Sequence, residues 1–238
     1  MKTKSFFVAL SLLTCSSVYS QKIFTAIENQ DFEKVSKLIE KGEDVNQKSK
    51  EYGITPLYSA AGTGNTKIVE LLISKGADVN MTMKTTATPL NIAAQEGFTK
   101  VVEILLKHNV NPNIRDVNGW TALRFATRNN QMEIVKLLVE NKATVDTKAN
   151  DNATPFASAI GKGYLNIAEY LIKNGANINN IDKDNETPIM YCAQGGNLET
   201  VKFLLPYKPD LTIKNKDGKT ALDLAKEKNN SEIVKLLQ

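Results

Sequence analysis

Apolar residues recur at helical spacing in a series of short segments that are separated by polar loops. In each segment two apolar residues are followed, after one other residue, by two more, so that one face of a helix is apolar. Three such segments contain Ile68, Val69, Leu71 and Leu72, then Val101, Val102, Ile104 and Leu105, and then Ile134, Val135, Leu137 and Leu138. Corresponding positions lie 33 residues apart, which predicts a repeated helical unit.

A shorter helix is expected before each of these segments, and a threonine marks its start. The marking residues are Thr55, Thr88, Thr121, Thr154, Thr187 and Thr220. A threonine hydroxyl accepts hydrogen bonds from the free amides of a first helical turn, and proline, which often follows here, is tolerated at the first helical position. Nine residues after each threonine only Gly or Asn occurs, as a left-handed helix stop requires.

These motifs together resemble the ankyrin repeat. The resemblance is carried by Thr55-Pro56-Leu57, by the paired Ala60-Ala61, by the Ile-Val-x-Leu-Leu helix and by Gly76-Ala77-Asp78-Val79-Asn80, and it extends over residues 22–238. It implies an all-α repeat solenoid of stacked helix-turn-helix units with short hairpin-like finger loops. Each unit would contact only its neighbours.

The repeat frame also divides the chain. The expected parts are a signal peptide (1–20), an N-terminal capping repeat with its loop (21–54), five repeats of 33 residues (55–219) and a C-terminal capping repeat (220–238). Lys34 and Lys37 stand where the next unit has Ile68 and Leu71, which suits a cap whose outer face meets water.

The first twenty residues differ from the rest. Lys2 and Lys4 precede an uncharged apolar run over residues 6–13, and Val18-Tyr19-Ser20 offers small residues for cleavage. This order is typical of a secretory signal peptide, so we expect export to the periplasm or medium, with cleavage after Ser20. The alternative is a lipid anchor, because Leu12-Leu13-Thr14-Cys15 resembles a bacterial lipoprotein box, although Thr14 departs from its usual small residue.

Two departures from the repeat pattern predict local irregularity. Lys142 and Lys208 replace the glycine of the turn after the second helix, and lysine is unfavourable in a left-handed conformation, so altered turns are expected there. Pro206 should end its helix early and make residues 204–212 the least regular part of the array.

Charge and chemistry narrow the function. The net charge of +4 falls near +2 once Lys2 and Lys4 are cleaved off, which argues against nucleic-acid binding. After that cleavage Cys192 is the only cysteine, so no intramolecular disulfide can form. His108 is the only histidine and has no visible catalytic partner. We therefore expect no cofactor, no metal and no enzymatic activity, and a monomer.

The resemblance implies that a partner contacts the finger loops and the exposed side of the first helices. Candidate contacts are Tyr52, Ile54, Tyr58, Trp120, Arg124 and Arg128. Trp120 is the only tryptophan, and all three arginines fall within residues 115–128; Trp and Arg are frequent in interface hot spots. The alternative is that Trp120 packs on a neighbouring finger and stabilises the array.

The expected function is therefore a protein–protein interaction module or scaffold that binds a protein partner in an extracytoplasmic compartment. An inhibitor or immunity-type protein that masks an enzyme or toxin is the first alternative, and the sequence does not separate the two. An enzyme is the second alternative, and it would need a polar cleft outside the repeat frame.

Overall fold

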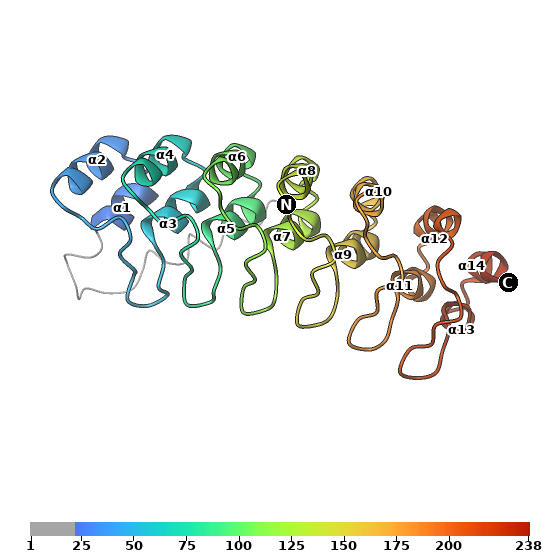
Figure 1. Cartoon of the computed structure of the whole chain (residues 1–238). Coiled ribbons are helices and arrows are strands. Elements are labelled where there is room, and N and C mark those ends of the chain that lie inside the picture. Colours follow the sequence, from blue (N-terminus) through green and yellow to red (C-terminus); the bar gives the residue numbers. More distant parts are fainter. Residues whose placement is uncertain (1–21) are drawn as a thin grey trace.

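The computed structural model describes residues 22–238, so the predicted signal peptide and Cys15 lie outside the described part. Within it, α-helices form two parallel rows, and finger loops project from one side of the stack (Figure 1). The inner row, next to the fingers, comprises α1 (Lys22–Glu28), α3 (Pro56–Thr63), α5 (Pro89–Glu96), α7 (Ala122–Arg128), α9 (Pro155–Lys162), α11 (Pro188–Gly195) and α13 (Ala221–Glu227). The outer row comprises α2 (Phe32–Glu40), α4 (Thr66–Ser74), α6 (Thr99–Lys107), α8 (Met132–Glu140), α10 (Leu165–Lys173), α12 (Leu198–Leu204) and α14 (Ser231–Leu237), and the 3-10 helix η2 (Leu205–Tyr207) follows α12.

The threonine and glycine signals set the ends of the inner helices. Thr55 caps α3 by accepting a hydrogen bond from the amide of Tyr58, at 3.1 Å, and Thr88, Thr154 and Thr220 cap their helices in the same way. Gly64 ends α3 in the left-handed conformation, at φ 74°. The cap expected at Thr121 and Thr187 is absent, since both hydroxyls are buried without a hydrogen-bond partner.

Small residues let the inner helices approach one another closely. Ala60, Ala93, Ala126 and Ala159 are fully buried between neighbouring units, whereas larger residues such as Leu72 fill the space between the two rows. The inner helices pack more closely on one another than the outer helices do. A stack with one tight row and one looser row curves toward the tight row, so the surface formed by the inner helices and fingers is concave.

The turn at Lys142 keeps the shape of the glycine turns, whereas the turn at Lys208 is altered. Both lysines adopt left-handed backbone conformations, at φ 67° and φ 55°, at a local cost of about 1–2 kcal/mol per residue. The expectation of an altered turn is wrong at Lys142, because the amide of Ala143 donates to the carbonyl of Leu138 as the corresponding amides of the glycine turns do. It is confirmed at Lys208, because Pro209 has no amide for that hydrogen bond and a 3-10 helix precedes the turn. The effect expected of Pro206 is confirmed, because α12 ends at Leu204 and continues as the 3-10 helix η2.

A ladder of side chains ties each turn to the next unit. At one position of the frame, an amide or carboxylate oxygen accepts a hydrogen bond from a backbone N–H of the following turn, at 2.7–2.9 Å. The accepting residues are Asn46, Asn80, Asn113, Asp146 and Asn179. Four of these are Asn, so Asp146 is the exception.

Candidate protein-binding surface

Trp120 is held at the base of its finger by a tight hairpin. Asp116 accepts hydrogen bonds from the backbone amides of Asn118 and Trp120, at 2.9 and 2.8 Å. Gly119 allows the reversal, at φ 76°. The finger therefore presents the indole in a fixed position at the start of α7.

The indole of Trp120 lies among three side chains of α7. The guanidinium of Arg124 is 4.7 Å and that of Arg128 5.0 Å from the ring centroid. The ring of Phe125 packs at 5.1 Å. Since cation–π contacts and aromatic packing both stabilise, Trp120 has a structural role whether or not a partner also contacts it, and it stays half-buried.

Arg124 joins neighbouring units instead of facing solvent. Arg124 is only 3% exposed to solvent. Its guanidinium donates two hydrogen bonds to the carboxylate of Asp151, at 2.9 and 3.1 Å, and a third to the carbonyl of Ala153, at 2.6 Å. The structure thus places Arg124 where a partner cannot reach it directly, and its role is to clamp the 151–153 finger onto α7.

The clamp also changes the titration of Asp151. Partial burial acts to raise the pKa of this carboxyl, but the hydrogen bonds from Arg124 and from the Ala153 amide, with the charge of Arg124, outweigh it. The net effect holds the pKa of Asp151 below its usual range. The carboxylate is therefore ionised and satisfied within the chain at neutral pH.

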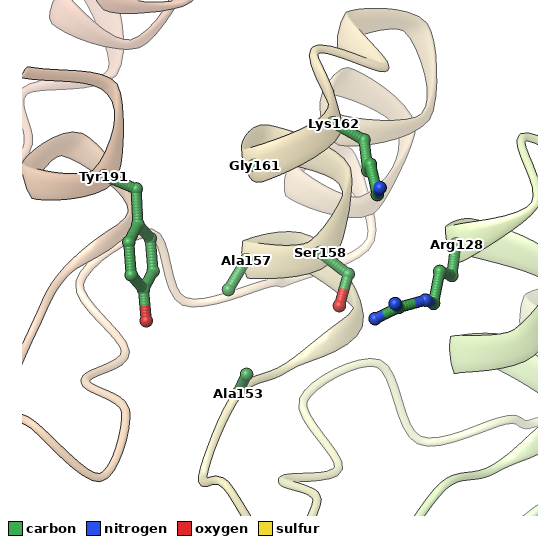
Figure 2. Close-up of a pocket in the computed structure, with 7 residues that line it drawn as sticks. All are labelled: Arg128, Ala153, Ala157, Ser158, Gly161, Lys162 and Tyr191. Carbon is green, nitrogen blue, oxygen red and sulfur yellow. The ribbon is translucent and has the colours of Figure 1, made fainter. Parts of the chain in front are cut away.

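Arg128, in contrast, is exposed and reaches into a hollow of the concave surface. This hollow, with a volume of about 310 Å³, lies along α9 between the C-terminal turn of α7 and Tyr191 of α11 (Figure 2). Ala153, Ala157, Ser158 and Gly161 form its floor. Lys162 closes its edge beside Arg128, so two cations border a floor of small side chains.

The first fingers carry the other three predicted residues. Tyr52 lies exposed at a finger tip, and Ile54 is half-buried at the base of the same finger. Tyr58, on α3, is half-buried, and its burial raises the pKa of its hydroxyl to about 12, with further contributions from Glu96 and Asp116. These residues lie on the same concave side as Trp120 but two units away along the array.

Of the residues that line the hollow, the predicted contacts include Arg128 but not the polar residues Ser158, Lys162 and Tyr191. Ser158 and Tyr191 belong to inner helices without any distinctive signal in the sequence. Lys162 had such a signal, because it is a charged residue at the end of an inner helix, whose exposed side the resemblance implies for partner contact.

Other reactive groups lie apart from this surface. Burial raises the pKa of the Cys192 thiol to about 12, so this cysteine is protonated at neutral pH and packs as a small apolar side chain. Among residues 22–238, no group of three or more His, Cys, Asp or Glu side chains could hold a metal ion. No helix in the same range has both the length and the apolar character that a membrane crossing requires.

Comparison with known proteins identifies the family. A solved structure of similar shape is the ankyrin repeat domain of Bcl-3, with a TM-score of 0.80, 22% identity and coverage of 91% of this chain and 97% of that one. The 2-5A-dependent ribonuclease of Mus musculus is 39% identical over 66 residues, or 28% of this chain. The putative ankyrin repeat protein FPV244 of fowlpox virus is 39% identical over 74 residues, or 31% of this chain.

These two matches cover only 9% and 11% of the relatives' own lengths. The similarity is therefore one of repeats and not of whole proteins. The family model for ankyrin repeats, in three copies, matches residues 23–116, 109–182 and 177–238. The predicted fold class is confirmed, and the chain belongs to the ankyrin-repeat family, whose repeat domains generally mediate protein–protein interactions.

Proposed function

We propose that this protein is a non-catalytic binding module that holds a partner protein against its concave surface. One observation carries the proposal: the exposed Arg128 and Lys162 border a hollow floored by small side chains, in the middle of an array whose other inner-helix residues are mostly buried in packing. A preformed concave surface binds without first being ordered, which lowers the entropic cost of association.

Enzymatic activity has little support in the described residues. The buried thiol of Cys192 is far from ionising at neutral pH, and Asp151 is held in its ionised form by Arg124. Burial raises the pKa of Glu28 and of Glu186, but neither of these acids lines the hollow. A catalytic site needs titratable groups that converge on one cleft. The hollow beside Arg128 is lined by one hydroxyl, one phenol and two cations, without a carboxylate or an imidazole.

We also propose that binding takes place outside the cytoplasm. The support is the order of positive, apolar and small residues in the first twenty positions, which is typical of an exported protein. Mass spectrometry of the N-terminus of the protein isolated from its own cells tests this. A chain that begins at Gln21 indicates soluble export, a lipid-modified Cys15 indicates an anchored form, and an intact Met1 in the cytoplasmic fraction contradicts the proposal.

Affinity capture from an envelope extract tests the binding role. The native chain is compared with an Arg128→Ala, Lys162→Ala variant and with a control variant, Lys67→Ala, Lys107→Ala, whose exposed lysines lie on the outer helices α4 and α6. Equal thermal unfolding of the three proteins is checked first. We expect one protein to be retained by the native chain and the control and to be lost by the concave-surface variant. Equal retention by all three would contradict a concave binding site.

A further inference from the structure

Two cations of the concave surface have no acidic partner. The ion pairs of the described residues include neither Arg128 nor Lys162. Two acids of the neighbouring fingers have other partners: Asp151 pairs with Arg124, and Asp182 accepts a hydrogen bond from the hydroxyl of Tyr191. Arg128 and Lys162 are therefore available for an ion pair with a carboxylate of another molecule.

The guanidinium of Arg128 is also held in place. Its stacking on Trp120, at 5.0 Å, directs it over the floor of the hollow toward Ser158, as Figure 2 shows. A guanidinium that is already oriented loses little side-chain entropy on pairing with a carboxylate. Its planar edge also fits two carboxylate oxygens at once.

The floor of the hollow is shaped for a chain segment. Ala153, Ala157 and Gly161 have no side-chain atom beyond Cβ, and a Cβ added at Gly161 would meet no atom within 4 Å. The hollow has a volume of about 310 Å³ and is open to solvent. Side chains of an extended peptide can therefore enter it, with apolar groups on the alanines and Tyr191 as the far wall.

We infer that the hollow along α9 binds an extended, acidic segment of the partner protein, in which an Asp or Glu pairs with Arg128 and Lys162 while a neighbouring apolar residue lies on Ala157 and Gly161. This inference rests on the proposed binding function and specifies the chemistry of the partner. The acidic residue lies at the edge formed by Arg128 and Lys162, because the charges of Asp182, Glu186 and Asp151 act on Tyr191 at the opposite wall and disfavour a further carboxylate there.

Selection from a library of displayed peptides tests the inference. The purified protein is panned against random peptides about 12 residues long, which span up to about 40 Å when extended. Three variants are panned in parallel. The first is the double variant Arg128→Gln, Lys162→Gln, and its control is the double variant Lys67→Gln, Lys107→Gln, which removes the same charge from the outer helices. The third is Gly161→Leu, which fills the hollow. Gly195→Leu is the control for the last, because a Cβ there also meets no atom within 4 Å.

We expect the native protein and both controls to select peptides enriched in Asp and Glu. The affinity of a selected peptide should fall about tenfold or more for the Arg128→Gln, Lys162→Gln variant, because the carboxylate of the peptide loses its charged partners. Added salt should also lower the affinity for the native protein. Gly161→Leu should abolish binding without unfolding, because leucine favours a helix more than glycine does.

Two results would overturn the inference. The first is that the selected peptides are not enriched in Asp and Glu, or bind the Arg128→Gln, Lys162→Gln variant as tightly as the native protein. If Gly161→Leu still blocked those peptides, the concave surface would remain a binding site, but not one for an acidic segment. The second is no selection above background by the native protein. Failure of the proposed function is seen separately, as equal capture of a partner from the envelope extract by the native chain and the Arg128→Ala, Lys162→Ala variant.

Discussion

Replacing Asp146 by Asn should stabilise the protein. In the ladder between units, Asn46 and Asn113 accept a hydrogen bond and also donate one, from Nδ2 to the carbonyls of Gly76 and Lys142, at 3.0 and 3.1 Å. The corresponding carbonyl for Asp146 is that of Gly175. A carboxylate cannot donate to it, and Oδ1 of Asp146 is buried without a partner.

The expected size follows from what the substitution changes. Asn keeps the acceptor that binds the amide of Asn177, at 2.9 Å, and supplies the missing donor. One added hydrogen bond contributes about 0.5–1.5 kcal/mol net, and removing an unsatisfied buried polar atom adds about 1 kcal/mol or more. We therefore expect the free energy of unfolding to rise by about 1–2 kcal/mol, which raises Tm by about 2–8 °C in a chain of this size.

Urea unfolding followed by circular dichroism, with thermal unfolding beside it, measures the effect. The reverse substitution, Asn113→Asp, is the matched control and should destabilise by a similar amount, because it removes the donor to the carbonyl of Lys142. The reasoning would be refuted if Asp146→Asn left the unfolding midpoint unchanged or lowered it while Asn113→Asp was harmless.

Three further predictions concern the clamp and the turns. Arg124→Ala should lower the free energy of unfolding by about 2–3 kcal/mol, because it removes three partly buried hydrogen bonds and the contact with Trp120, whereas Arg128→Ala should cost less than about 1 kcal/mol; urea unfolding that ranks the two equally would contradict this. The pKa of Asp151 is lowered by folding, so the stability that its ionised form contributes is complete above its unfolded pKa of about 4 and is lost as the pH falls through the folded value. The stability difference between the native protein and Asp151→Asn should accordingly shrink below about pH 4, and a pH-independent difference would be inconsistent with the ion pair. Lys142→Gly should raise the unfolding midpoint by relieving a left-handed lysine, a gain of about 1 kcal/mol; no change in thermal unfolding would mean that the turn is unstrained.

The repeat frame was readable from the sequence because it depends on local chemistry. A threonine cap, a glycine stop and an apolar helical face each specify backbone conformation within a few residues. Because these signals recur every 33 positions, the repeat is recognised even where one unit lacks one of them. Pro206 belongs to the same class, since the loss of its amide acts on its own helix.

The features that sequence reasoning missed depend on contacts between units. Nothing local distinguishes Arg124 from an exposed helical arginine, and only the position of Asp151, 27 residues later, shows that it is buried. Similarly, Lys142 takes a conformation that lysine alone disfavours, because the two flanking helices impose the turn. The floor of the hollow beside Arg128 consists of small residues of α9 and its finger, whereas Arg128 of α7 and Tyr191 of α11 border it, so no single repeat reveals the hollow.

Site-specific photo-crosslinking in the cells that produce the protein tests the central claim most directly. A photoreactive side chain is placed at position 158 in the hollow, replacing Ser158, and in a second strain at position 133 on the outer helix α8, replacing the exposed Glu133. The account predicts one defined crosslinked species, containing a second protein, from position 158 and none from position 133. Crosslinks from position 133 alone, or the same species in equal yield from both positions, would contradict binding through the concave surface.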